Sequence, residues 1–151
     1  MKKQNSHDPT ETFNIAKDLA LEIHSPILIG LTGELGTGKT VFAKGFAEGL
    51  KVQELVTSPT FLGICEYYSG NMPFIHMDFY KKVVSKKDID SYLKKGSVVL
   101  IEWFENFSSV FNDDVKPDIC VYIQYVKDKE GNLLNDERQI EWQTSLTRQS
   151  G

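Results

Sequence analysis

The sequence predicts an α/β fold in which a glycine-rich turn joins a buried strand to a helix. An apolar run at residues 28–32 leads into the stretch GELGTGKT, and apolar residues at helical spacing follow it. A second apolar run, VVLIEW, carries the carboxylate of Glu102 near its end. Helical and strand-like segments alternate along much of the chain, an order typical of α/β proteins.

The glycine-rich stretch matches the pattern G-x-x-x-x-G-K-[ST] without a mismatch. Glycines can adopt positive φ and have no Cβ, so successive backbone N–H groups can point into one concavity that holds anionic oxygens. The helix that follows adds the positive end of its dipole. The sequence therefore predicts a nucleotide phosphate site. Its expected residues are Gly33, Glu34, Leu35, Gly36, Thr37, Gly38, Lys39 and Thr40.

The last two residues of this motif have separate expected roles. The Lys39 ammonium should bridge the β- and γ-phosphates, and the Thr40 hydroxyl should ligate Mg²⁺. A chance match in a chain of this length has odds of roughly 1 in 200 at average glycine content. The alternative is a glycine-rich β–α turn that binds nothing.

Composition bounds the class of protein. A chain of 151 residues is expected to form one domain, residues 1–151, with ordinary hydrophobic and charged content. It contains no apolar run near the roughly 20 residues that cross a membrane, and its first ten residues lack a secretory signal. Cys65 and Cys120 stand apart from any Cys/His cluster. Reduced thiols in a cytoplasmic protein, rather than a zinc site, are expected.

The charge distribution leaves two interpretations open. A net charge of −4 argues against a generic nucleic-acid binder. Residues 81–95, however, contain six lysines against two aspartates, and the lysines are Lys81, Lys82, Lys86, Lys87, Lys94 and Lys95. This segment is either a solvated helix face or a docking surface for an acidic partner or RNA.

The first half of the chain is expected to begin with a disordered tail at residues 1–7. A helix should then begin at Asp8 as N-cap, with Pro9 and Glu11 in its first turn, and end before the Ser-Pro at residues 25–26. A buried strand at residues 27–32 precedes the glycine-rich loop. The helix after the loop should run to about residue 50.

Two hairpins and a helix are expected in the remainder. Strands at residues 61–68 and 72–79 should pair antiparallel, and a helix at 85–95 should end at Gly96. The VVLIEW strand follows at 97–103, with an irregular or helical piece after it. Strands at 118–126 and 138–146, joined by a polar turn at 127–137, should form the second hairpin.

Asp78 and Glu102 are expected where buried strands end. In an α/β sheet such carboxylates face the crevice that binds ligands, so they are candidates to hold metal and the attacking water. His76 lies on the same strand face as Asp78, and a buried structural histidine is the preferred interpretation. Thr60, in the hydroxyl-rich loop 57–60, is a candidate for a loop that orders on Mg²⁺ and γ-phosphate, against a merely structural turn.

Four stretches occur in one order: GELGTGKT, SPTF, HMDFY and IEW. Together they resemble the TsaE (YjeE) family over roughly residues 10–105. The resemblance implies a P-loop NTPase-type three-layer sandwich, with a mixed sheet and added antiparallel strands. It also implies an ATP hydrolase that uses Mg²⁺ and binds the TsaB–TsaD complex in threonylcarbamoyladenosine formation, with TsaC in the same pathway, tRNA involved only indirectly and no membrane contact.

The resemblance also assigns residues. It implies catalytic roles for Lys39, Asp78 and Glu102, and metal contacts from Thr40 and Glu102. Nucleotide contacts are further implied at Thr12, Trp103 and Glu105. Two positions depart from the family pattern, because Lys81 replaces a common arginine and Phe104 replaces a common proline. Lysine cannot make the planar bidentate contact of arginine.

Two other functions are possible for a phosphate loop. A small-molecule kinase normally clamps phosphate with several arginines, whereas this chain has only Arg138 and Arg148, both late in the sequence. A GTP-dependent switch would carry an N-K-x-D stretch, which the sequence lacks. Because no arginine is placed to stabilise the transition state, we expect slow intrinsic hydrolysis that rises when partners bind.

Overall fold

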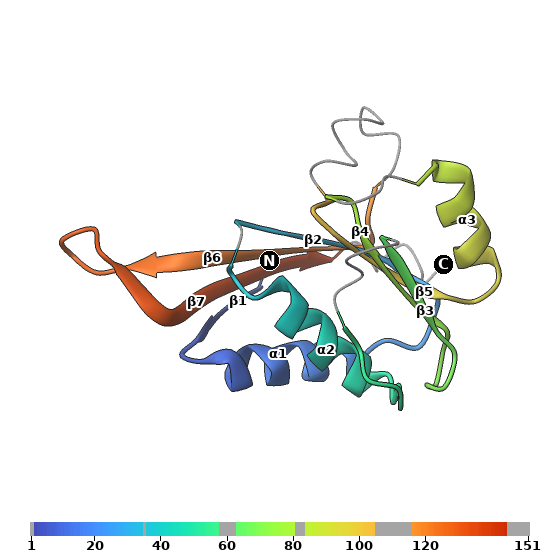
Figure 1. The fold of residues 1–151 in the computed structure, drawn as a ribbon, viewed down its shortest axis with the longest axis horizontal. Coiled ribbons are helices and arrows are strands. Elements are labelled where there is room, and N and C mark those ends of the chain that lie inside the picture. Colours follow the sequence, from blue (N-terminus) through green and yellow to red (C-terminus); the bar gives the residue numbers. More distant parts are fainter. Residues whose placement is uncertain (1, 35, 58–62, 81–83, 105–115, 145–151) are drawn as a thin grey trace.

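The structure is a computed structural model that describes residues 2–34, 36–57, 63–80, 84–104 and 116–144. Over these residues the chain forms a seven-stranded sheet and three helices (Figure 1). The strands are β1 (Lys2–Ser6), β2 (Leu28–Gly33), β3 (Ile64–Tyr67), β4 (Phe74–Asp78), β5 (Val98–Glu102), β6 (Ile119–Lys127) and β7 (Leu133–Thr144). The helices are α1 (Pro9–Leu21), α2 (Lys39–Gly49) and α3 (Lys86–Lys94). None of the described helices is long and apolar enough to cross a membrane.

The sheet is mixed, with strand order β1-β7-β6-β2-β5-β4-β3. Its centre is parallel, because β2 pairs with β5 and β6, and β5 also pairs with β4. The strands β2, β4 and β5 are almost wholly buried, as expected for a parallel sheet covered on both faces. Antiparallel pairs extend this centre, with β3 beside β4 on one side and β7 and β1 beyond β6 on the other. The predicted α/β fold and the predicted hairpin of β3 and β4 are confirmed.

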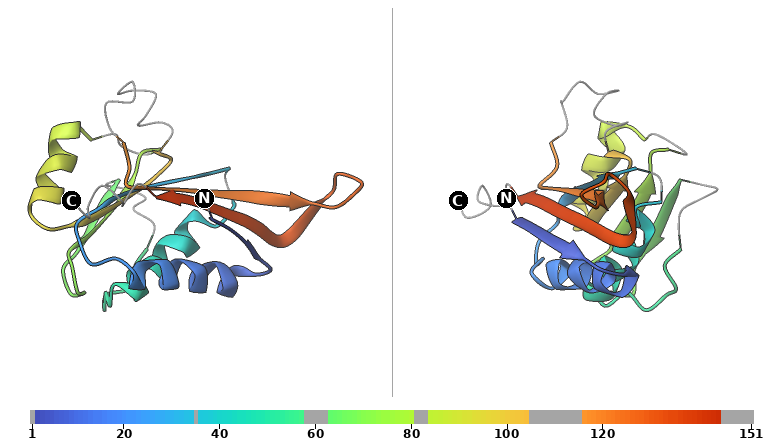
Figure 2. Two further views of the ribbon diagram at one scale, coloured as in Figure 1. Left: turned by 180° about the vertical axis from the view of Figure 1, so that it is seen from behind. Right: turned by 90° about the vertical axis from the view of Figure 1, so that its left-hand side faces the viewer.

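Helices cover both faces of the sheet and complete a three-layer sandwich (Figures 1 and 2). Helices α1 and α2 lie side by side on one face, and α3 lies on the other. Successive residues of β2 alternate between the two cores: Ile29 and Leu31 pack under α1 and α2, and Leu28 packs on the α3 side. The hairpin of β6 and β7 projects beyond the helices (Figure 1).

Helix α1 begins at the predicted cap, and α3 begins at the predicted start of its helix, where Ser85 is the N-cap. The Asp8 carboxylate accepts a hydrogen bond from the backbone N–H of Glu11 at 2.8 Å, with Pro9 in the first turn. The Ser85 hydroxyl oxygen accepts one from the N–H of Asp88 at 3.1 Å. Gly96 follows α3 with a φ of 93°, a left-handed conformation that favours glycine.

The N-terminal residues form a strand, so the predicted disordered tail at residues 1–7 is wrong. Strand β1 pairs antiparallel with β7, from Lys2 opposite Trp142 to Ser6 opposite Arg138. The sequence KKQNS contains no apolar residue, and its side chains are exposed apart from Ser6. Backbone hydrogen bonds to β7, rather than burial of apolar side chains, therefore hold this edge strand.

The second hairpin has a shorter turn than predicted. Strand β7 begins at Leu133, so the second part of the polar stretch expected as turn at residues 127–137, residues 133–137, belongs to a strand. The Asp128 carboxylate closes the turn by accepting hydrogen bonds from the N–H groups of Glu130 and Asn132, each at 2.9 Å. Gly131 supplies the positive φ of 86°. The hydrogen bonds accepted by Asp128 and the positive φ of Gly131 are enough to reverse the chain direction. The polar residues on either side can therefore pair as strands.

Candidate nucleotide site

The glycine-rich loop joins the end of β2 to the start of α2. Gly36 and Gly38 have φ values of 82° and 104°, which side chains with a Cβ rarely adopt. Gly38 is also the N-cap of α2, and no side chain caps this helix, whereas Asp8 and Ser85 cap α1 and α3. The first turn of α2 therefore presents its backbone N–H groups without a carboxylate or hydroxyl from the chain. Such a helix end suits an anion from outside the chain.

The Lys39 ammonium lies inside this loop. Lys39 is 6% exposed, and its Nζ donates hydrogen bonds to the backbone oxygens of Gly33 and Glu34, the latter at 3.2 Å. Nζ also lies 3.6 Å from the centroid of the Trp103 ring, within the range of a cation–π contact. Trp103 reaches this place through a backbone φ of 61°. The lysine is thus held close to where phosphate oxygens would enter.

The two predicted carboxylates are neighbours on adjacent parallel strands. Asp78 of β4 lies opposite Glu102 of β5, and Glu102 lies opposite Leu31 of β2, two residues before Gly33. Both carboxylates are buried, with 6% and 3% of their surface exposed. The Asp78 carboxylate accepts a hydrogen bond from the N–H of Tyr80 at 2.9 Å, and the Glu102 carboxylate bonds Nε2 of His76. The carboxyl ends of the three strands thus gather both acids beside the loop, as predicted.

The ligand set suits Mg²⁺ bound together with phosphate. Among the described residues no group of three or more His, Cys, Asp or Glu side chains could hold a metal alone. Mg²⁺ rarely uses such cages: it keeps several waters and takes one or two carboxylates plus phosphate oxygens. Glu102 at the strand end and Thr40, partly exposed in the first turn of α2, provide ligands of the right kind.

Thr12, at the start of α1, is buried and contacts the N-terminal strand. Its hydroxyl lies 2.7 Å from the Ser6 hydroxyl, which in turn donates to the backbone oxygen of Asp8. Thr12 thus ties α1 to β1, and any contact with a nucleotide base remains a prediction. Leu35, Thr60 and Glu105, which were also predicted to bind nucleotide, lie outside the described residues, as does Lys81.

Arg138 contacts the loop, and the sequence did not predict this. Its Nε donates to the backbone oxygen of Thr37 at 3.1 Å, and its Nη2 donates to that of Gly36 at 3.4 Å. The guanidinium also stacks on Tyr125 of β6, with 4.6 Å between its central carbon and the ring centroid. The scarcity of arginine in the chain was the available signal, because one of only two arginines falls on a strand beside the loop.

Phe104, where the family often has proline, has a packing role. It is 8% exposed and belongs to the core on the α3 side. A Cβ on Gly30 of β2 would lie 2.5 Å from the Phe104 ring, so the ring occupies the space that glycine leaves over the central strand. Phe104 therefore packs against Gly30 of the strand that carries the loop.

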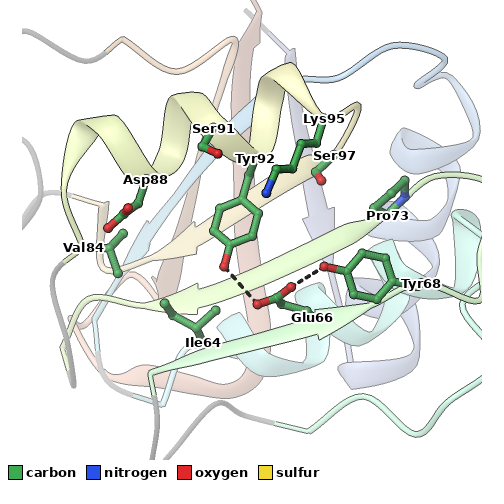
Figure 3. Close-up of a pocket in the computed structure, with 10 residues that line it drawn as sticks. All are labelled: Ile64, Glu66, Tyr68, Pro73, Val84, Asp88, Ser91, Tyr92, Lys95 and Ser97. Carbon is green, nitrogen blue, oxygen red and sulfur yellow. Dashed lines mark hydrogen bonds between the residues drawn. The ribbon is translucent and has the colours of Figure 1, made fainter.

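Two of the hollows formed by the described residues bear on the candidate site. A groove of about 780 Å³ borders the loop at Gly33 and Glu34 and continues along Trp103, Tyr122 and Leu133. A smaller pocket of about 350 Å³ lies between α3 and the hairpin of β3 and β4 (Figure 3). Of the predicted site residues that the structure describes, none lines the smaller pocket. The groove beside the loop is therefore the hollow that continues the candidate site.

Comparison with known proteins identifies relatives of this chain. The family model "Threonylcarbamoyl adenosine biosynthesis protein TsaE" matches residues 6–145. The chain is 43% identical over 103 residues to the tRNA threonylcarbamoyladenosine biosynthesis protein TsaE of Bacillus subtilis, covering 67% of this chain and 65% of that protein. It is 33% identical over 105 residues to the protein of the same name from a Nostoc species, covering 65% of each. The matched part is thus just under two thirds of the length of these two relatives.

A solved structure agrees with the fold. The crystal structure of YdiB from Bacillus subtilis superposes with a TM-score of 0.76 at 32% sequence identity. The alignment covers 97% of this chain and 87% of that one. The family match spans the glycine-rich loop, both strand-end carboxylates and Arg138. The chain therefore belongs to the TsaE family, with the P-loop-type α/β fold that its sequence predicts.

Proposed function

We propose that this chain is a Mg²⁺-dependent ATPase that works in threonylcarbamoyladenosine formation on tRNA. One observation carries the proposal: Lys39 and the uncapped start of α2 lie at the same sheet edge as the buried acids Asp78 and Glu102. A loop of this kind alone supports nucleotide binding, and the added carboxylates support hydrolysis. The names of the relatives support a role in this tRNA pathway.

The residues divide the work as follows. Backbone N–H groups of the loop and the Lys39 ammonium bind the β- and γ-phosphates and stabilise the charge that develops on them. Thr40 and Glu102 would hold Mg²⁺, which neutralises phosphate charge when bound. Asp78, buried and fixed by the N–H of Tyr80, orients the water that attacks the γ-phosphate in line.

Before it can bind phosphate, the Lys39 ammonium must release the oxygens of its own loop. It now bonds Gly33 and Glu34 and lies under Trp103. Arg138 bonds other oxygens of the loop, and Arg148 lies outside the described residues. We therefore expect slow hydrolysis by the chain alone. A TsaB–TsaD complex that supplies an arginine to the transition state could raise the rate by about 10³–10⁵-fold.

Hydrolysis measured with and without TsaB and TsaD tests the proposal. The wild-type chain should hydrolyse ATP slowly alone and faster with the complex, and Lys39→Ala should be inactive in both. Lys44→Ala, on an exposed position of α2, removes the same charge outside the site and should behave as wild type. Stable ATP in every mixture would overturn the assignments of Asp78 and Glu102. Preference for GTP, or phosphoryl transfer to a nucleoside, would replace the proposal with a switch or a kinase.

A further inference from the structure

His76 is a fully buried histidine whose polar contact is with a carboxylate of the proposed site. It lies in β4 with 0% of its surface exposed, and its ring stacks on Phe74 with 6.1 Å between centroids. Its Nε2 bonds the Glu102 carboxylate of the neighbouring strand. The sequence suggested that His76 is a structural residue. This contact connects it to Glu102, the predicted metal ligand.

The second ring nitrogen argues against a purely structural role. Among the described residues, no hydrogen-bond partner reaches Nδ1 of His76, although the atom is buried. Buried polar atoms in folded proteins are nearly always paired, and an unpaired one is unfavourable. An apolar ring of similar shape would fill the same space beside Phe74 without leaving an unpaired nitrogen. The hydrogen bond to Glu102 therefore explains why an imidazole, rather than an apolar ring, occupies this position.

We propose that His76 is a positioning residue that holds the Glu102 carboxylate ready for Mg²⁺, an inference that rests on the proposed function. With a proton on Nε2, the ring donates a hydrogen bond to the Glu102 carboxylate. This bond restricts the rotation of a glutamate side chain that otherwise loses rotamer freedom when it binds a metal. Hydrogen bonds from outer residues to metal-binding carboxylates typically change metal affinity by about 10–100-fold.

The test is metal binding, measured apart from catalysis. Electron paramagnetic resonance of Mn²⁺ with ADP would give the metal affinity of the wild-type chain, His76→Leu, His76→Gln and Glu102→Gln. Leucine removes the donor, so His76→Leu should bind Mn²⁺ about 10–100-fold more weakly. Glutamine can place its amide N–H near the position of Nε2, so His76→Gln should restore affinity to within a few-fold. ADP binding without metal should be the same in all four proteins.

Each outcome decides between the positioning role and its alternatives. Equal Mn²⁺ affinity in His76→Leu and wild type, with Glu102→Gln weakened, would overturn the inference and leave the proposed function intact. If the wild-type chain with ADP does not bind Mn²⁺, the proposed function itself would be overturned. A structural role predicts that His76→Leu and His76→Gln lose thermal stability and ADP binding together, without rescue of the metal site by glutamine. If His76→Leu does not fold, His76→Asn replaces it, because its shorter amide cannot reach Glu102.

Discussion

Lys39 and Trp103 form a cation–π contact in the candidate site. The φ of 61° at Trp103 is unfavourable for a bulky residue by about 1–2 kcal/mol. A cation–π contact between a buried ammonium and an indole stabilises by a similar amount, about 1–2 kcal/mol. The contact thus offsets the strained backbone that creates it. To bind Lys39, a nucleotide phosphate must interact with the ammonium more favourably than the Trp103 ring and the two loop oxygens do.

Trp103 should therefore report nucleotide binding by its fluorescence. The chain has two tryptophans, and Trp142→Phe leaves Trp103 as the single tryptophan. ATP should draw the ammonium from the ring toward phosphate and change the intensity of the emission. In the same background, Lys39→Ala should show an altered emission before ATP is added and no further change with it. An emission that ATP leaves unchanged, although calorimetry shows binding, would contradict this account of Lys39.

Arg138 should support ATP affinity through the shape of the loop. Arg138→Ala removes two hydrogen bonds to loop oxygens and the stacking on Tyr125. Bonds of this kind contribute about 0.5–1.5 kcal/mol each, so the Kd for ATP should rise by roughly tenfold. Arg138→Lys keeps the charge but cannot make the forked contact, and should recover little of the loss. Full recovery with lysine would show that net charge near phosphate, rather than loop geometry, is what matters.

At the scale of elements, the approach of α1 to α2 depends on Gly45. A Cβ there would lie 2.1 Å from the backbone oxygen of Phe13, and backbone cannot move aside as a flexible side chain can. Gly45→Ala should therefore lower the free energy of unfolding by about 1–3 kcal/mol, although alanine favours helix. Lys44→Ala, one residue earlier and exposed, should have little effect in the same urea titration. Unchanged stability of Gly45→Ala would mean that the helices can separate freely.

The contact between α3 and β3 should depend on pH through Tyr92. Its hydroxyl donates to the Glu66 carboxylate at 2.9 Å, and Tyr68 donates to the same carboxylate (Figure 3). Burial, followed by the bond to Glu66, raises the pKa of Tyr92 to about 12. Because the folded pKa lies above the unfolded value, the stabilisation is fully present below pH 10 and is lost as pH rises toward 12.

Difference titration isolates this tyrosine. Absorbance at 295 nm of the wild-type chain minus that of Tyr92→Phe should show ionisation near pH 12, and the stability advantage of wild type over the variant should shrink between pH 10 and 12. Glu66→Gln should shift the ionisation to lower pH, because it removes the negative charge. An ionisation of Tyr92 near pH 10 in the folded wild-type chain would contradict the contact.

At the scale of the whole molecule, the sequence predicts two kinds of feature well: local structure, and the side chains that lie where strands end. The turn at residues 33–40, the cap at Asp8 and the carboxylates Asp78 and Glu102 each follow from residues adjacent in sequence. Parallel strands with carboxyl ends at one edge then bring those acids together. The glycine-rich loop, the surrounding strands and the candidate acids were therefore predictable.

Pairing between distant segments was not predictable. Strand β1 has no apolar pattern and exists because β7, over 130 residues later, offers its backbone. The same sheet edge brings Arg138 to the loop, at a separation of about 100 residues. The bond from His76 to Glu102 depends on the register of β4 and β5, which the sequence of either strand leaves open. These long-range contacts place additional side chains around the glycine-rich loop, and the sequence motif alone does not show them.

Calorimetric titration with ATP and Mg²⁺ tests most directly whether this sheet edge is a nucleotide site. The wild-type chain and Lys44→Ala should bind one nucleotide per chain with the same Kd. Lys39→Ala removes a charge-assisted bond to phosphate and should bind roughly 10–100-fold more weakly. Equal affinity of all three proteins, or no heat from the wild-type chain at millimolar ATP, would contradict the assignment of the loop.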